Sequence, residues 1–196
     1  MIAHAASEGN SVKNLIEYLY SGREAGHKGE DKQADLVTIH GTLIAPINFQ
    51  DREIIDRLKI DFQRRQEQYN LAKNEPAKER MGHHIIAFSE SDMRKMTAKK
   101  VQQITEEYIK LAGIDKTQHI ALSHKDTDSF HVHIAFSRVL ENGKLYKSWQ
   151  EKNKTIERGV ALNLKHGLQL EGDQHKVSQT RQVVELRSTM DDMDAK

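Results

Sequence analysis

Residues 124–139 read HKDTDSFHVHIAFSRV, and this stretch is the most informative part of the chain for both fold and chemistry. It places His124, His131 and His133 around a turn-like DTDS run. His131 and His133 are two residues apart, so on a β-strand both side chains point to one face. Neutral imidazole is the commonest protein metal ligand, and three histidines leave coordination positions open for a substrate. The pattern therefore predicts a tri-histidine metal site, with a structural or pH-sensing cluster as the alternative.

The residues around the histidines predict two adjacent strands, at 119–123 and 130–136. Apolar residues alternate with the histidines along 130–136, which predicts a half-exposed strand with a buried apolar face and an open histidine face. The register between the strands stays open. Pairing His124 with His131 gathers the three histidines, but it also brings Ile120 and Leu122 to their face. A one-residue shift would bury those two residues and move His124 away, and a local bulge would satisfy both needs.

Composition limits the classes of protein that fit. The chain has 196 residues, 37% of them hydrophobic, and only 2 prolines, which suits one domain with a real core. It has no cysteine, so disulfides and thiolate zinc sites are excluded. We expect a cytoplasmic protein without a membrane partner, because the sequence shows no signal peptide and no bilayer-spanning apolar run. The net charge of +1 means that a nucleic-acid partner would need a local basic patch.

The chain alternates between strand-like and helix-like segments. Strands are predicted at 1–6, 36–44, 80–89, 119–123 and 130–136, and helices at 11–20, 50–73, 97–112 and 152–166. This order predicts an α/β fold, a two-layer sandwich in which helices pack on one face of a mostly antiparallel five-stranded sheet. We expect the domain to span 1–168. Residues 169–196 would form a polar tail or a loosely docked helix, which would lead into further domains if the chain is a piece of a longer protein.

Three motifs together resemble those of conjugative and mobilisation relaxases of the MobP type. The run His131-Val132-His133, preceded by His124-x-Asp126, is similar to the signature of HUH endonucleases, which is a pair of histidines flanking a bulky apolar residue. Residues 15–19, LIEYL, resemble the N-terminal nucleophile motif of these enzymes, and residues 84–89, HIIAFS, are similar to their middle motif. The resemblance covers about residues 1–170, and it implies a fold of the HUH-endonuclease type.

The resemblance implies an enzyme that nicks and rejoins one DNA strand at a plasmid or mobile-element transfer origin. Tyr18 would attack the scissile phosphate and form a 5′-phosphotyrosyl intermediate, with Asp126 orienting a histidine or helping to deprotonate the tyrosine. His124, His131 and His133 would hold one divalent metal ion. Relaxases use Mn²⁺ or Mg²⁺, and imidazole ligands also suit Zn²⁺, Ni²⁺ or Co²⁺. The implied partners are single-stranded origin-of-transfer DNA and accessory mobilisation proteins.

Two tyrosines compete for the role of nucleophile. Tyr18 and Tyr20 lie roughly 200° apart around a helix, so they cannot both face one metal. Tyr18 matches the position of the motif, and Tyr20 is the alternative nucleophile. Trp149 is a candidate for stacking on bases, and the candidate contacts to the DNA backbone are Arg138, Lys144, Lys147 and Lys152. The remaining histidines with no evident partner are interpreted as surface or strand residues: His27, His40, His83 and His84.

Three other classes of protein share some of these features. Rolling-circle replication initiators also combine an HUH site with a tyrosine, but their tyrosine follows the histidines. Here the only tyrosine after His133 is Tyr146, so the order of the motifs favours a relaxase. A tri-histidine metallohydrolase would activate water and form no DNA adduct. In a non-catalytic nucleic-acid-binding module of similar fold, the histidines would be incidental.

Overall fold

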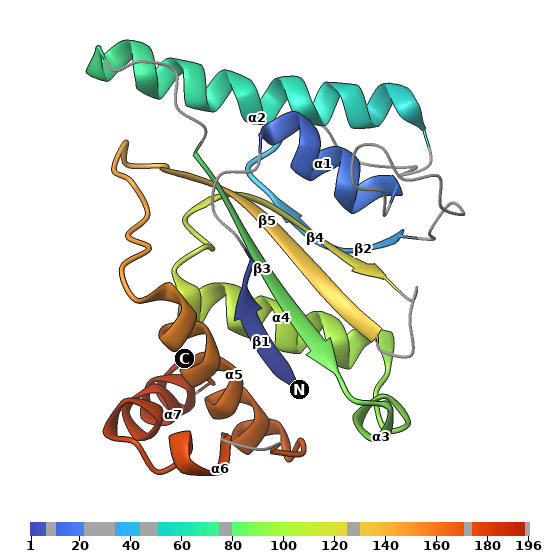
Figure 1. The fold of residues 1–196 in the computed structure, drawn as a ribbon, viewed down its shortest axis with the longest axis vertical. Coiled ribbons are helices and arrows are strands. Elements are labelled where there is room, and N and C mark those ends of the chain that lie inside the picture. The colour runs from blue at the N-terminus through green and yellow to red at the C-terminus, as the bar shows by residue number, and fades with distance from the viewer. Residues whose placement is uncertain are drawn as a thin grey trace.

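The structure is a computed structural model, and it describes residues 1–6, 11–21, 34–43, 51–74, 80–124, 130–170 and 174–194. Within these ranges, five antiparallel strands form one sheet in the order β1-β3-β5-β4-β2 (Figure 1). The predicted five-stranded antiparallel sheet is therefore confirmed. The strands are β1 (Ile2–Ala5), β2 (Ala34–His40), β3 (Met81–Phe88), β4 (Thr117–His124) and β5 (Phe130–Leu140).

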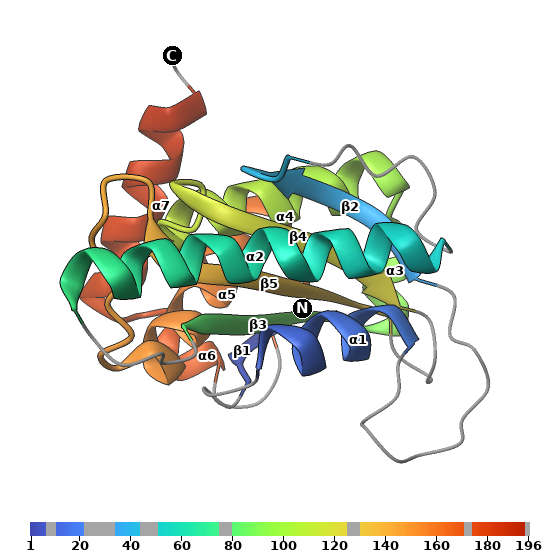
Figure 2. The same cartoon turned by 90° about the horizontal axis from the view of Figure 1, so that it is seen from above.

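Helices cover both faces of this sheet (Figures 1 and 2). Helices α1 (Val12–Ser21) and α2 (Arg52–Lys73) lie on one face, while α4 (Ala98–Ala112) and α5 (Glu151–His166) lie on the other. Each side has its own apolar cluster. The α/β class holds, but the helices form layers on both sides of the sheet, where packing on one face was expected. The remaining described helices are α3 (Glu90–Met93), α6 (Gln174–Val177) and α7 (Arg181–Asp194).

The central strands require two covered faces because their side chains are largely apolar on both sides. Val132 and Ile134 of β5 belong to the cluster beneath α4 and α5, whereas Ala135 belongs to the cluster beneath α1 and α2. An open face would leave this apolar area in contact with water. The expected open histidine face is therefore wrong, since α1 covers it with Leu15 and Leu19, which are at most 1% exposed.

Local sequence signals set the ends of the helices that position the site. Ser11 caps α1, with its Oγ accepting a hydrogen bond from the backbone N–H of Asn14 at 3.0 Å. Helices α4 and α5 end, as predicted, at Gly113 and Gly167, whose φ angles of 69° and 64° are left-handed and favour glycine. Ion pairs from Glu17 to Arg52 and Lys59 tie α1 to α2.

The C-terminal segment contributes to the core. Helix α7 packs against α5, and its residues Val183 and Met190 are fully buried in the cluster on that side of the sheet. The predicted domain boundary at residue 168 stays a prediction. Within the described ranges, no helix combines the length and apolar character needed to cross a bilayer.

Candidate active site

The hydrogen-bonded pairing of β4 with β5 gathers three histidines. His124, the last residue of β4, lies opposite His131, and His133 follows two residues along β5. Each imidazole offers one nitrogen, and these nitrogens lie within 4.8 Å of one another. His124 and His133 are each 1% exposed, whereas His131 is half-buried, so the cluster reaches the surface on the side of His131. The structure thus brings together the three histidines that the sequence singles out.

The register of this pairing answers the question that the sequence left open. His124 pairs with His131 without a bulge beside it, and the irregularity between β4 and β5 lies instead between Thr117 and His119. Ile120 and Leu122 share the face of the histidines and are buried in the cluster that α1 and α2 cover. Apolar residues and histidines can therefore share one face of the sheet, because α1 and α2 bury the apolar residues.

Hydrogen bonds to two of the imidazoles restrict where their lone pairs lie. The Nε2–H of His124 donates to the backbone carbonyl of Leu19 at 2.6 Å, since a carbonyl oxygen can only accept. A neutral His124 therefore has its lone pair on Nδ1. His133 Nδ1 lies 2.9 Å from His83 Nε2, and His133 Nε2 is buried without a hydrogen-bond partner among the described residues. A buried, unpartnered imidazole nitrogen beside two other imidazoles fits a divalent metal, which such a nitrogen would bind.

The electrostatics of the cluster favour neutral histidines. Burial, followed by the nearby imidazoles of His83, His124 and His131, lowers the pKa of His133 to about 2. Burial also lowers the pKa of His83 to about 3, with His84 and other histidines adding to the effect. A neutral imidazole is the form that binds metal. At neutral pH His133 is therefore a neutral base, which can bind a metal without first losing a proton.

Tyr18 lies against this cluster. Its ring meets that of His133 edge-on, with centroids 5.4 Å apart and an interplanar angle of 79°, and its centroid lies 6.1 Å from that of His83. Tyr20 is also partly buried, next to the apolar cluster on this side of the sheet. Burial and the carboxylate of Asp51 raise the pKa of Tyr20 above its ordinary value. Tyr18 is thus in ring contact with His133, a member of the histidine cluster, and with His83 beside it.

Two histidines of β3 have partners that sequence reasoning missed. His83 lies edge to edge with His133, with ring centroids 5.1 Å apart and planes 22° apart, on the face that α1 covers. His84 points to the other face, where its Nδ1 lies 2.9 Å from the hydroxyl of Tyr108, a buried residue of α4. Both are strand residues, as predicted, but they are buried, at 6% and 2% exposed, and each has a partner that the sequence did not reveal. The consecutive pair within an apolar strand was the available signal, because a central strand between two helical layers buries both of its faces.

His40 and His27 were also interpreted as surface or strand residues, and the structure describes only the first of them. His40 was expected to lack a partner, but its Nε2 lies 3.1 Å from Glu141 and its ring stacks on that of His119. It is nevertheless a surface residue, as expected, with a side chain 48% exposed. His27 lies outside the described residues, as does Asp126, the proposed helper of the tyrosine.

The candidate DNA contacts lie toward the far end of β5 from the histidines. Arg138 is seven residues beyond His131, which corresponds to roughly 23 Å along a strand. It is half-buried, and its Nη2 donates to Ser148 Oγ at 3.0 Å. Trp149 is 71% exposed, with Lys154 Nζ 5.5 Å from its ring centroid. The three candidate lysines are exposed. Two lie between β5 and α5 and one lies in the first turn of α5: Lys144, Lys147 and Lys152.

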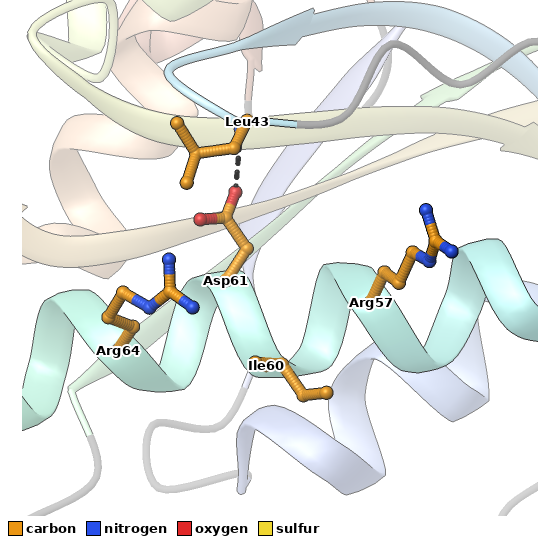
Figure 3. Close-up of a pocket in the computed structure, with 5 residues that line it drawn as sticks. All are labelled: Leu43, Arg57, Ile60, Asp61 and Arg64. Atoms are coloured by element: carbon orange, nitrogen blue, oxygen red, sulfur yellow. Dashed lines mark hydrogen bonds between the residues drawn. The ribbon is translucent and has the colours of Figure 1, made fainter.

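A separate surface pocket lies between α2 and the residues that follow β2 (Figure 3). Asp61 accepts hydrogen bonds there from the backbone N–H of Leu43 at 2.9 Å and from Gln118 Nε2 at 3.0 Å. Ile60, Arg57 and Arg64 complete the lining. The pocket shares no residue with the histidine cluster.

Comparisons with known proteins identify the domain. The family model described as "Relaxase: MobA/VirD2-like, nuclease domain" matches residues 37–168, which include all three histidines and β3 but begin after α1. Neither the curated proteins nor the solved structures contain a match to this chain. Because the family model covers more than half of the chain, the chain belongs to the MobA/VirD2-like relaxase family and carries its nuclease domain.

Proposed function

We propose that this domain nicks and rejoins one strand of DNA at a transfer origin, with Tyr18 as the nucleophile. The observation that carries the proposal is the contact of the Tyr18 ring with His133, within a cluster of three histidines, in a relaxase nuclease domain. A nuclease that activates only water would not need a tyrosine as its nucleophile. Tyr18 lies before the matched region, so its role rests on the structure and on the motif at residues 15–19.

His124, His131 and His133 are the residues that would hold one divalent metal ion. Bound there, the metal would supply positive charge to the scissile phosphate and offset the negative charge that develops during attack. Mn²⁺ or Mg²⁺ are the expected ions, and the all-imidazole donor set also suits Zn²⁺, Ni²⁺ and Co²⁺. The hydrogen bond from His124 to Leu19 fixes one ligand against α1, the helix that carries Tyr18.

The reaction we propose is a transesterification. The Tyr18 Oη forms a bond to phosphorus, while the bond between phosphorus and the 3′ oxygen breaks and its electron pair stays on that oxygen. The phenol proton leaves, and a proton is taken up to give a free 3′ hydroxyl. The 5′ phosphate stays on Tyr18 as a phosphodiester, so no nucleotide cofactor is needed and the reverse step rejoins the strand.

Tyr18 needs help to ionise, because an unperturbed phenol has a pKa of about 10. Asp126, which follows β4 in the sequence, is our candidate for orienting a histidine or accepting the proton. Tyr20 is less suited to attack, because burial and Asp51 raise its pKa and so disfavour the phenolate. Single-stranded DNA would extend from the site toward Lys144, Lys147 and Lys152, where the exposed Trp149 can stack on a base. Accessory mobilisation proteins would act beside this domain.

The test is incubation of the chain with a single-stranded origin oligonucleotide and Mn²⁺, followed by denaturing electrophoresis. A covalent protein–DNA band that maps to Tyr18 and disappears in Tyr18→Phe supports the proposal. Tyr20→Phe is the matched control and should keep most of the activity. Cleavage without an adduct would indicate a metallohydrolase, and an adduct on Tyr20 would assign the nucleophile to the other side of α1.

A further inference from the structure

His83 contacts the histidine cluster, but the proposed function gives its imidazole no role. It lies in the middle of β3, which is hydrogen-bonded on one side to β1 and on the other to β5. Only 6% of the residue is exposed. Its Nε2 lies 2.9 Å from His133 Nδ1, and the two rings are nearly parallel. His83 is outside the group of three histidines whose nitrogens lie within 4.8 Å of one another.

The contact between the two imidazoles allows two arrangements of protons. In the first, His133 Nδ1–H donates to His83 Nε2, and the lone pair of His133 is on Nε2. In the second, His83 Nε2–H donates to His133 Nδ1, and the proton of a neutral His133 is on Nε2. The second arrangement leaves an N–H group buried without an acceptor, because His133 Nε2 has no hydrogen-bond partner among the described residues. It also leaves His133 unable to bind a metal through that nitrogen.

We infer that His83 is a positioning residue, which accepts a hydrogen bond from His133 Nδ1–H and thereby presents the His133 Nε2 lone pair to the metal. The inference rests on the proposed metal site. Outer hydrogen-bond acceptors of metal-binding histidines fix the tautomer and the orientation of the ring. Here the acceptor is a neutral imidazole, so it orients His133 without adding negative charge to the site.

The surroundings of His83 make it a rigid acceptor. The backbone of β3 is fixed by strands on both sides, with His83 opposite Ala135 of β5. The next residue, His84, is held on the other face of the sheet by the hydroxyl of Tyr108. The Tyr18 ring lies against both His83 and His133, so the hydrogen-bonded pair also supports the tyrosine that we propose as the nucleophile. Loss of the His83 imidazole should therefore loosen both the ligand and the packing of Tyr18.

The first test measures Mn²⁺ binding to the full chain by calorimetry. His83→Leu removes the acceptor and should weaken binding by about ten- to hundredfold, the usual effect of removing such a partner. His83→Gln, whose side-chain oxygen can accept from Nδ1–H, should restore most of the affinity. His40→Leu is the matched control, since His40 is a histidine of the surface that pairs with Glu141. Unchanged affinity in His83→Leu, or equal loss in the leucine and glutamine variants, would overturn the inference.

A second measurement does not depend on the variants folding. In the ¹⁵N-histidine-labelled chain with Zn²⁺, NMR should show His133 protonated at Nδ1 and coordinated through Nε2. Coordination through His133 Nδ1, or through His83 itself, would refute the positioning role. The outcomes separate this inference from the proposed function. If the wild-type chain nicks DNA and binds Mn²⁺, and His83→Leu binds Mn²⁺ with the same affinity, only the inference is refuted. If the wild-type chain binds no Mn²⁺, the metal site is refuted as well.

Discussion

Mild acid should destabilise the metal-free domain, because His83, His84 and His133 are buried as neutral bases. Burial lowers the pKa of His83 and His84 to about 3 and that of His133 to about 2. The unfolded chain takes up a proton on each histidine near pH 6.5, while the folded chain does not. Their contribution to stability is therefore fully present above pH 6.5 and is lost progressively as the pH falls below it.

The size of the effect follows from the pKa values of the unfolded state. At pH 5.5, one unit below the unfolded pKa, each histidine favours unfolding by about 1.4 kcal/mol. Three such residues give about 4 kcal/mol, a large part of the 5–15 kcal/mol that is typical of the stability of a domain. Carboxylates contribute little in this window. Glu107 is an example. Desolvation raises its pKa, but hydrogen bonds from His166 and Lys165 outweigh this and lower the pKa to about 2. Its pKa in the unfolded chain is near 4.5, so the carboxylate is ionised in both states at pH 5.5 and above.

Urea unfolding at pH 7.5 and pH 5.5, in the presence of EDTA, measures this loss. His84→Gln, which removes one buried titrating group, should reduce the pH-dependent loss by about 1.4 kcal/mol. A wild-type free energy of unfolding that changes by less than about 1 kcal/mol between the two pH values would refute the neutral burial of these histidines.

Three other perturbations test the packing and the proposed DNA contacts. Gly82→Ala should cost at least about 2 kcal/mol in urea unfolding, because an added Cβ would lie 2.2 Å from Phe136 Cζ; a cost below about 0.5 kcal/mol would show that the ring moves aside freely. Truncation after residue 168 removes Val183 and Met190, whose burial is worth about 3–6 kcal/mol together. An unchanged unfolding midpoint would support a domain boundary there. Replacement of Lys144, Lys147 and Lys152 by glutamine should lower the slope of log K against log salt for single-stranded DNA by about 2, and an unchanged slope would place the DNA elsewhere.

The sequence predicted the sheet because the strand signals were local. Alternation along β5 and the turn composition between 124 and 130 indicated two adjacent strands. The same pattern allowed a register that gathers the three histidines, but only the structure shows that His124 pairs with His131. These features depend on neighbouring residues, so a single sequence contains them.

Features that depend on distant residues could not be predicted in the same way. The alternation in β5 predicted an exposed histidine face, but the apolar residues of α1 that cover it, such as Leu15 and Leu19, lie more than a hundred positions away. The partner of His83 lies 50 positions away, and the sequence contains no sign of that contact. Which layer a helix joins, and which histidine meets another, are decided by tertiary packing.

Helix α1 has a double role that links the fold to the proposed chemistry. Its apolar side closes the face of the sheet on which the histidines lie, so that side of the helix is fixed by the burial of Leu15 and Leu19. The carbonyl of Leu19 then accepts the hydrogen bond from His124, which fixes the last turn of the helix relative to the end of β4. Tyr18 is thereby held edge-on to His133. Because one helix both covers the core and carries the tyrosine, the packing that stabilises this layer also sets the distance between the proposed nucleophile and the proposed metal ligands.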